Sequence, residues 1–195
     1  MTFEKFSVEG TTGLSRLELL ARDTPDKCLN VEELDRPLAV TQESRAELPK
    51  VSDETRTRLE EKGWTSEILD SINSEAEATI YENSALEPGR INGKDVLLRT
   101  DIDYDMKDVF GRTNLERMNR GLAPLDNDQK PVELHHIGQK QDSPLAELSR
   151  DEHRGKGNDN VLHNKLKESE INREDFNMER QDHWKARADQ IGASI

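Results

Sequence analysis

The sequence has a single cysteine, Cys28, and few aromatic or apolar side chains. One cysteine excludes an internal disulfide and a thiolate metal site, so any bound metal is expected to be held by His, Asp, Glu or Asn. Aromatic residues make up 4% and hydrophobic residues 32% of the 195 positions, which predicts a small core under a large polar surface. Because no long apolar run occurs, we expect no membrane span, and the basic-then-apolar start of a usual signal peptide is also missing.

Positive charge is scarce as well. The chain has 28 Lys and Arg residues against 41 Asp and Glu residues, a net charge of −13. Such a balance alone argues against a nucleic-acid partner, because phosphates are bound by Lys and Arg. However, residues 107–167 contain 11 basic and 10 acidic residues, so the acidic excess lies outside this segment. This central segment therefore remains a candidate for contact with nucleic acid.

The N-terminal part of the chain is weakly patterned. One short helix is expected at 13–22, and three prolines between positions 25 and 49 interrupt the following stretch. Two short helices are expected within 52–73, because Ser52 or Asp53 can cap the first and Thr65 or Ser66 the second. We predict an acidic, irregular N-terminal arm over 1–75 and a second domain over 76–195.

Turn and capping residues divide the rest of the chain into short elements. Asn92-Gly93 is a turn signal, and Thr113 with Glu116 and Ser149 with Glu152 fit capping boxes. The elements expected in chain order are strands at 78–81 and 96–98, a helix at 114–120, strands at 132–137 and 145–148, a helix from 150, a helix over 161–168 and a long polar helix over 173–190, which Asn172 can cap.

Four of the five histidines fall within a short stretch: His135 and His136 on a predicted strand, and His153 and His163 downstream. Adjacent residues on a strand point to opposite faces, so the first two histidines suit different tasks. A strand, a turn, a second strand and a helix with a histidine can bring a strand ligand and helix ligands around one ion. We therefore predict His135, His153 and His163 as metal ligands and His136 as a general base.

Phosphodiester hydrolysis requires such a set of groups. A cation neutralises the charge that develops on the phosphate and the leaving oxygen, while a base with a pKa near 7 activates water. Imidazole ligands suit Zn²⁺ and Ni²⁺, whereas a mixed site with waters suits Mg²⁺ or Mn²⁺, so the identity of the single divalent ion stays open. The candidate phosphate-binding residues are Arg112, Arg117, Arg120, Arg154 and Lys156.

Other polar residues near the histidines allow two interpretations. Glu147 can orient His136 or complete the metal shell, but a solvated strand carboxylate is the favoured interpretation. Asn158 and Asn160 can fix an imidazole or belong to an ordinary loop. His183 lies far downstream in a charged helix and is not part of the predicted site.

The ordered motifs resemble a known family. The segments are 111–118, 121–124 and 133–139, continued by 145–148, 152–155 and 162–163. Over about 107–167 the chain resembles the LHH family of toxin nucleases, in the HNH/endonuclease VII (ββα-metal) superfamily. The resemblance implies an α+β fold with a small ββα-metal core surrounded by helices. It also implies that His136 is the catalytic base and that His135, beside it in the active site, binds metal, while His153 and His163 replace a closer pair of helix histidines.

The resemblance further implies a DNase domain at the C-terminus of a bacterial polymorphic toxin used in interbacterial competition. Such a toxin is made in the bacterial cytoplasm, is delivered into a target cell and acts on DNA in its cytoplasm, and a cognate immunity protein blocks it. The acidic N-terminal segment is then expected to join a delivery module or contact a partner. Three alternatives stay open: an RNase with the same site, a non-catalytic module with a closed structural metal site, and an interaction protein that works through its acidic N-terminal half.

Overall fold

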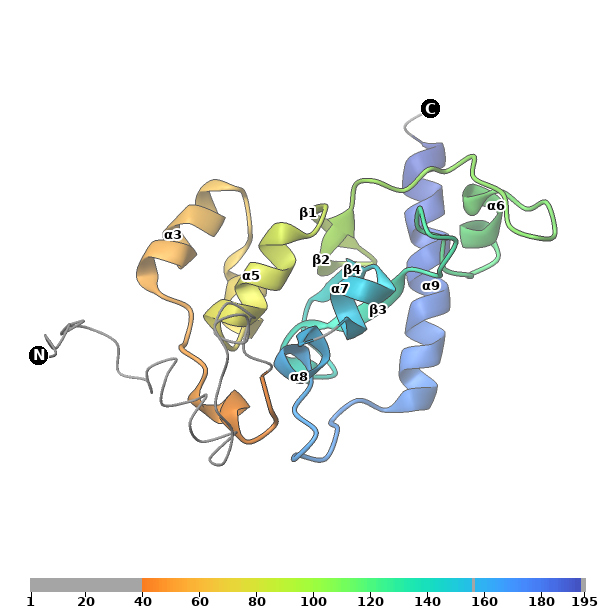
Figure 1. Ribbon diagram of the computed structural model, residues 1–195. Coiled ribbons are helices and arrows are strands. Elements are labelled where there is room, and N and C mark those ends of the chain that lie inside the picture. The colour runs from red at the N-terminus through yellow and green to blue at the C-terminus, as the bar shows by residue number, and fades with distance from the viewer. Residues whose placement is uncertain (1–39, 156, 194–195) are drawn as a thin grey trace, which may run out of the picture. The chain divides into compact units, whose positions relative to one another are not determined.

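A four-stranded sheet with the strand order β1-β2-β4-β3 lies at the centre of the computed structural model, which describes residues 40–155 and 157–193 (Figure 1). β1 (Leu86–Ile91) and β2 (Lys94–Arg99) form an antiparallel hairpin. The expected turn at Asn92-Gly93 is confirmed, and both residues have positive φ, as a tight hairpin turn requires. β4 (Leu145–Leu148) lies parallel to β2, and β3 (Glu133–His136) pairs antiparallel with β4 at the sheet edge.

The register of β3 against β4 decides which side chains share a face. His135 is paired with Ala146, and His136 is paired with Leu145. Because directly paired residues point to the same side and neighbours alternate, His135 and His136 face opposite sides of the sheet. The expected division of the two histidines between faces is therefore confirmed.

The face that carries His135 is covered by short helices. These are α3 (Asp53–Glu61), α4 (Ser66–Ser71), α5 (Glu75–Asn83), α7 (Arg150–Arg154) and α8 (Asn158–Leu162). Leu59, Trp64 and Ile68 pack in one buried cluster with Leu97 and Leu148 of the sheet. The two helices expected within 52–73 are confirmed, with Ser52 and Thr65 as their N-caps. The domain boundary expected at 75/76 stays a prediction.

The opposite face is covered by α9 (Arg173–Gly192), with α6 (Asn114–Asn119) packed against it (Figure 1). Trp184 of α9 and Met118 of α6 are buried with Leu134 and Leu145 of the sheet. The long polar helix and its Asn172 cap, and both capping boxes, agree with expectation. No helix within the described residues is long and apolar enough to cross a membrane.

Two expected elements are wrong, and a third lies outside the described residues. Residues 78–81 belong to α5 rather than to a strand, because Ser74 caps a helix there and Ala78 and Tyr81, three positions apart, are buried on one side. The helix expected over 161–168 begins earlier, at Asn158, and ends at Leu162. The helix expected at 13–22 is not within the described part.

Several short pieces were not expected from the sequence. β1 contains Pro88 and Gly89, which disfavour a strand, but it lies at the sheet edge, where proline is tolerated. Two 3₁₀ turns complete the described elements, η1 (Ser44–Glu47) and η2 (Ile137–Gln139). The second of these directly follows His136 and includes Gly138, whose φ of 72° is a left-handed conformation.

Candidate active site

Three of the predicted histidines converge on one point. His135 lies on β3, His153 on α7, and His163 directly follows α8. Nε2 of His153 is 3.1 Å from Nδ1 of His135 and 3.1 Å from Nε2 of His163. One ligand atom from each of the three side chains lies within 4.8 Å of the others, so the three could hold one metal ion.

The outer ring nitrogens of two of these histidines face oxygen atoms. Nδ1 of His153 lies 2.6 Å from Oε2 of Glu133, and Nδ1 of His163 lies 2.9 Å from Oδ1 of Asp159. Since a proton on each Nδ1 satisfies these acceptors, the neutral rings present lone pairs at both Nε2 atoms. Two lone pairs 3.1 Å apart repel each other unless a cation lies between them. The donor set, with a carboxylate behind each of the two imidazoles, therefore fits a divalent metal ion.

The electrostatic environment keeps two of the rings ready to bind metal. Burial, together with the neighbouring imidazoles, lowers the pKa of His135 well below its ordinary value. Burial and the neighbouring His153 also lower the pKa of His163, although Asp159 partly opposes them. Because metal binding requires the unprotonated imidazole, both shifts favour the ligand form at neutral pH.

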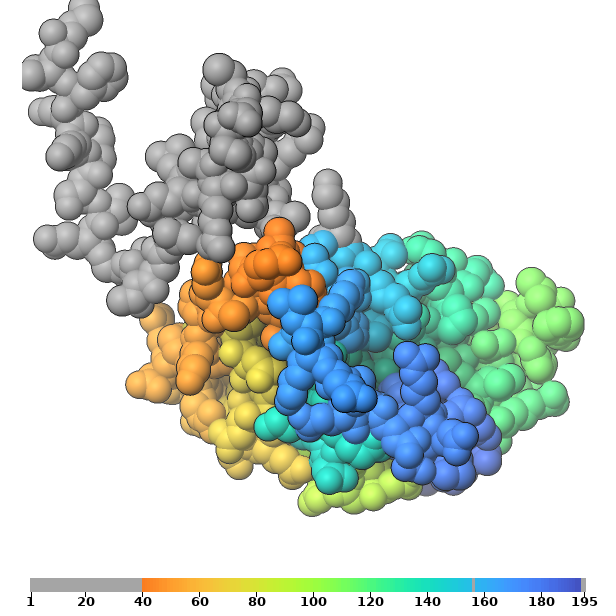
Figure 2. Space-filling view, turned by 90° about the horizontal axis from the view of Figure 1, so that it is seen from below, coloured from red at the N-terminus to blue at the C-terminus, as the bar shows by residue number. Residues whose placement is uncertain are grey.

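A residue from far upstream fixes the chain at His163. The side-chain amide of Gln42 donates to the carbonyl oxygen of His163 at 2.9 Å and accepts a hydrogen bond from the backbone N–H of Lys165 at 2.6 Å. Arg45 Nε donates to the carbonyl oxygen of Val161 on α8, the helix that His163 follows. Figure 2 shows the orange segment that begins at residue 40 against the blue segment after α8. No local pattern around residue 42 predicts this contact, because it spans 121 positions.

His136 lies on the other face, against α9. Its Nε2 is 2.9 Å from Oε2 of Glu179, and its ring centroid is 4.6 Å from that of Phe176. Glu179 also accepts a hydrogen bond from Nζ of Lys94 at 2.5 Å. Burial raises the pKa of the Glu179 carboxyl, but His136 and Lys94 outweigh it and hold the pKa below its ordinary value. Glu179 thus presents an ionised carboxylate to the ring of His136, and sequence reasoning missed it.

The interpretation of Glu147 as a solvated strand carboxylate is wrong. Its side chain is fully buried rather than solvated, with Oε1 2.7 Å from Nε2 of His183 and Oε2 accepting from the backbone N–H of Arg99. His183 is 2% exposed, so this pair fastens α9 to the sheet. Asn158 and Asn160 both form hydrogen bonds with the backbone through their side-chain amides. Asn158 donates to the carbonyl oxygen of Glu152, and Asn160 donates to the carbonyl oxygen of Val40.

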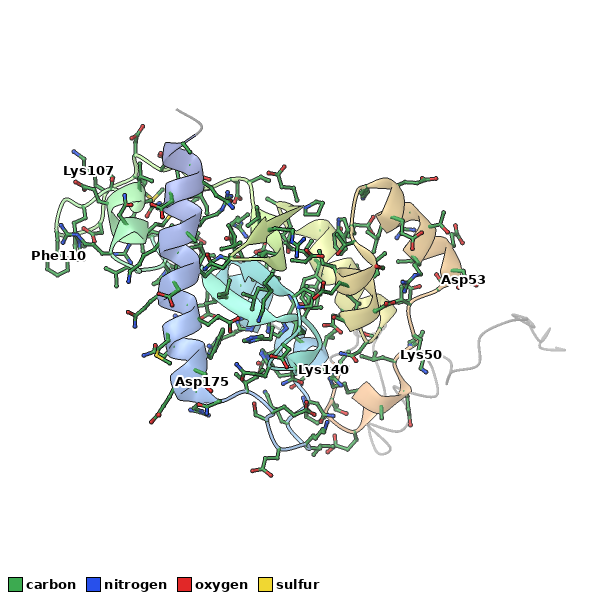
Figure 3. The ribbon with its side chains drawn as sticks, turned by 180° about the vertical axis from the view of Figure 1, so that it is seen from behind. Lys50, Asp53, Lys107, Phe110, Lys140 and Asp175 are labelled. Carbon is green, nitrogen blue, oxygen red and sulfur yellow. The ribbon has the colours of Figure 1, made fainter. Side chains whose placement is uncertain are left out.

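The four histidines His135, His136, His153 and His163 line a cleft of about 700 Å³. Of the predicted phosphate-binding residues, Arg154 and Arg120 line it. Arg112 and Arg117 do not; both donate at 2.8 Å to Oδ2 of Asp108, in the loop region between β2 and α6. In Figure 3, Lys107 and Phe110 mark this loop on the side of α9 away from the sheet. Lys156 lies outside the described residues. Arg173 and Arg180 of α9 also line the cleft, and they were missed from the sequence.

Comparison with known proteins matches the segment that carries these histidines to a family. Residues 113–190 match the LHH family, described as a nuclease of the HNH/ENDO VII superfamily with conserved LHH. In this chain Leu134, His135 and His136 form that motif, and His153 and His163 also lie within the matched segment. No solved structure matches the chain. Residues 113–190, which carry all four histidines of the site, are thus similar to the LHH nucleases of the HNH/ENDO VII superfamily.

Proposed function

We propose that this protein is a metal-dependent endonuclease that cleaves DNA. The observation that supports the proposal most strongly is the convergence of three imidazoles at a cleft that a fourth histidine, His136, also lines. A divalent ion held there supplies positive charge to stabilise the phosphate and the leaving oxygen. The match of residues 113–190 to a nuclease family agrees with this chemistry, since phosphodiester hydrolysis is the reaction of such enzymes.

In this proposal each side chain has one task. His135, His153 and His163 hold the ion, with Glu133 and Asp159 fixing the orientation of the last two rings. His136 removes the proton from the attacking water as the general base. Glu179 positions His136 by its contact with Nε2, so Nδ1 is the ring atom left to take the proton.

The biological context belongs to the same proposal. We infer that the chain is the toxin domain of a bacterial effector, delivered into a competing cell where it degrades DNA. A cognate immunity protein then protects the producing cell, and the segment before the nuclease connects to a delivery module or adaptor. The sequence resemblance supports this context.

The test is cleavage of supercoiled plasmid in a metal series of Mg²⁺, Mn²⁺, Zn²⁺ and Ni²⁺, with chelator as the blank. The wild-type chain should nick plasmid only with a divalent ion, and His136→Ala should stop nicking while it retains the melting temperature and the metal affinity. Full cleavage by that variant would exclude His136 as the base.

Two further outcomes separate the alternatives. If the protein degrades RNA while plasmid stays intact, it is an RNase with the same site rather than a DNase. If neither substrate is cut, and chelation or His153→Ala only lowers the melting temperature, the three histidines form a structural metal site.

A further inference from the structure

The charge of the cleft is opposite to the charge of the protein. Although the chain carries a net charge of −13, the residues that line the cleft include four arginines and one carboxylate, Glu133. The arginines come from three regions: Arg120 follows α6, Arg154 ends α7, and Arg173 and Arg180 lie on α9. The cleft therefore presents positive charge where the overall composition favours negative charge.

The single carboxylate does not neutralise the arginines on α9. Oε2 of Glu133 lies 2.6 Å from His153 and 2.7 Å from Arg154, so it is already engaged. Arg120 and Arg173 form no ion pair with another described residue. Arg180 donates to Oδ1 of Asn177 at 2.6 Å and lies 5.2 Å from the ring centroid of Phe176. Three guanidinium groups at the cleft thus lack a carboxylate partner within the described part of the chain.

Several arginines away from the cleft are paired with carboxylates. Arg112 and Arg117 share Asp108, and Arg90 on the outer strand β1 contacts Asp95. With 41 acidic side chains available, an arginine without a carboxylate is not explained by a shortage of partners. An anion from outside the protein would satisfy the guanidinium groups at the cleft, and a phosphodiester is an anion whose oxygens fit their fork of donors.

The spacing on α9 suits an extended ligand. Arg173, Asn177 and Arg180 are four and then three positions apart, so they share one helix face, and all three line the cleft. Seven residues of helix span roughly 10 Å, and one strand of a duplex carries a phosphate about every 3.4 Å of the duplex axis, so the row covers about three phosphates measured along that axis. Phe176, between them on α9, contacts His136 and Arg180. The arginine row thus leads directly to the proposed general base.

We propose that the face of α9 formed by Arg173, Asn177 and Arg180, together with Arg120, is a track that binds the sugar-phosphate backbone of DNA and guides one strand to the histidines. This inference rests on the proposed function and names the substrate contacts of that site. Arg120 extends the track because Gly121, the next residue, lies against Gln181 of α9. Phosphate binding is thus assigned to α9, and Arg112 and Arg117 instead hold their own loop.

The test is equilibrium binding of the full chain to a fluorescent DNA duplex, measured by anisotropy across a salt series with chelator present so that no strand is cut. Each phosphate contact contributes about 0.9 to the slope of log K against log salt concentration. Arg180→Gln should therefore reduce the slope by about 0.9, and Arg173→Gln with Arg180→Gln by roughly 1.8. Arg180→Lys, which keeps the charge, should preserve the slope.

The matched control is Arg90→Gln, which removes the same charge from β1, the sheet edge opposite β3. It should leave the slope unchanged, and melting temperatures should confirm that every variant is folded. If the α9 variants bind as Arg90→Gln does, the track is refuted, even where the wild-type chain cuts plasmid. If the wild-type chain binds with the expected slope and the α9 variants lose it, the track holds, even where no cleavage occurs and the proposed nuclease function fails.

Discussion

Replacing Gln42 should weaken metal binding, although this residue is no metal ligand. Its amide forms one hydrogen bond with the carbonyl oxygen of His163 and one with the N–H of Lys165. A hydrogen bond of this kind contributes about 1 kcal/mol net, so Gln42→Ala removes roughly 2 kcal/mol of support for the backbone at His163. If this whole free energy stabilises the metal-bound conformation, the dissociation constant of the metal rises about thirtyfold in Gln42→Ala. This value is an upper bound, because water can replace the lost hydrogen bonds.

The assay is competition for Zn²⁺ against a chromophoric chelator, with the melting temperature of the metal-free chain measured in parallel. Gln42→Glu keeps the acceptor for Lys165 but lacks the N–H that reaches His163, so it should also bind metal more weakly than the wild type. Arg45→Ala is the control, because Arg45 holds the carbonyl oxygen of Val161 rather than the histidine. An unchanged zinc affinity in Gln42→Ala, or an equal loss in Arg45→Ala, would refute the reasoning.

Two further predictions concern stability. His183→Ala leaves the fully buried carboxylate of Glu147 without its imidazole, so it should lower the free energy of unfolding by about 3 kcal/mol in urea denaturation; a wild-type midpoint would contradict this. In the metal-free chain, the lowered pKa values of His135 and His163 mean that the native state binds fewer protons than the unfolded state below about pH 6.5. The urea concentration at the midpoint of unfolding should therefore decrease as the pH is lowered from about 7.5 to about 5.5. A midpoint that stays constant over this range would be evidence against these pKa shifts.

The features that the sequence predicted well are those with a local physical cause. The capping boxes at Thr113 and Ser149 and the cap at Asn172 each depend on residues at most three positions apart. The same is true of the Asn92-Gly93 turn and of the opposite orientation of two adjacent strand residues. The strands and the helix that carry His135 and His153 follow each other closely in the chain, so these local rules allowed the two side chains to be placed near each other.

The features that the sequence did not predict depend on distant partners. Glu147 is buried because α9 brings His183 against it from 36 positions away, and nothing near residue 147 indicates that packing. Arg112 and Arg117 were predicted to bind phosphate because of their charge, but both form ion pairs with Asp108. At 78–81 the β-branched and aromatic residues favoured a strand, but the cap and the burial spacing of α5 prevailed.

The groups that complete the site extend well upstream of the segment that matches the family. Gln42 holds the backbone of His163, and Lys94 binds the carboxylate of Glu179 that contacts the proposed base. Glu77, fully buried, accepts hydrogen bonds from the hydroxyl of Tyr81 and the N–H of Gly138, two residues after His136.

Burial raises the pKa of Glu77, so these hydrogen bonds stabilise a group that the interior disfavours in its charged form. The turn at Gly138, which requires a positive φ, is thereby tied to α5. A segment that starts at residue 113 would retain all four histidines of the site but lose the contacts that orient His163, fix Glu179 and hold the turn after His136. The geometry of the site is therefore a property of the chain from Gln42 onward, because the matched segment supplies the histidines and the preceding residues supply part of their support.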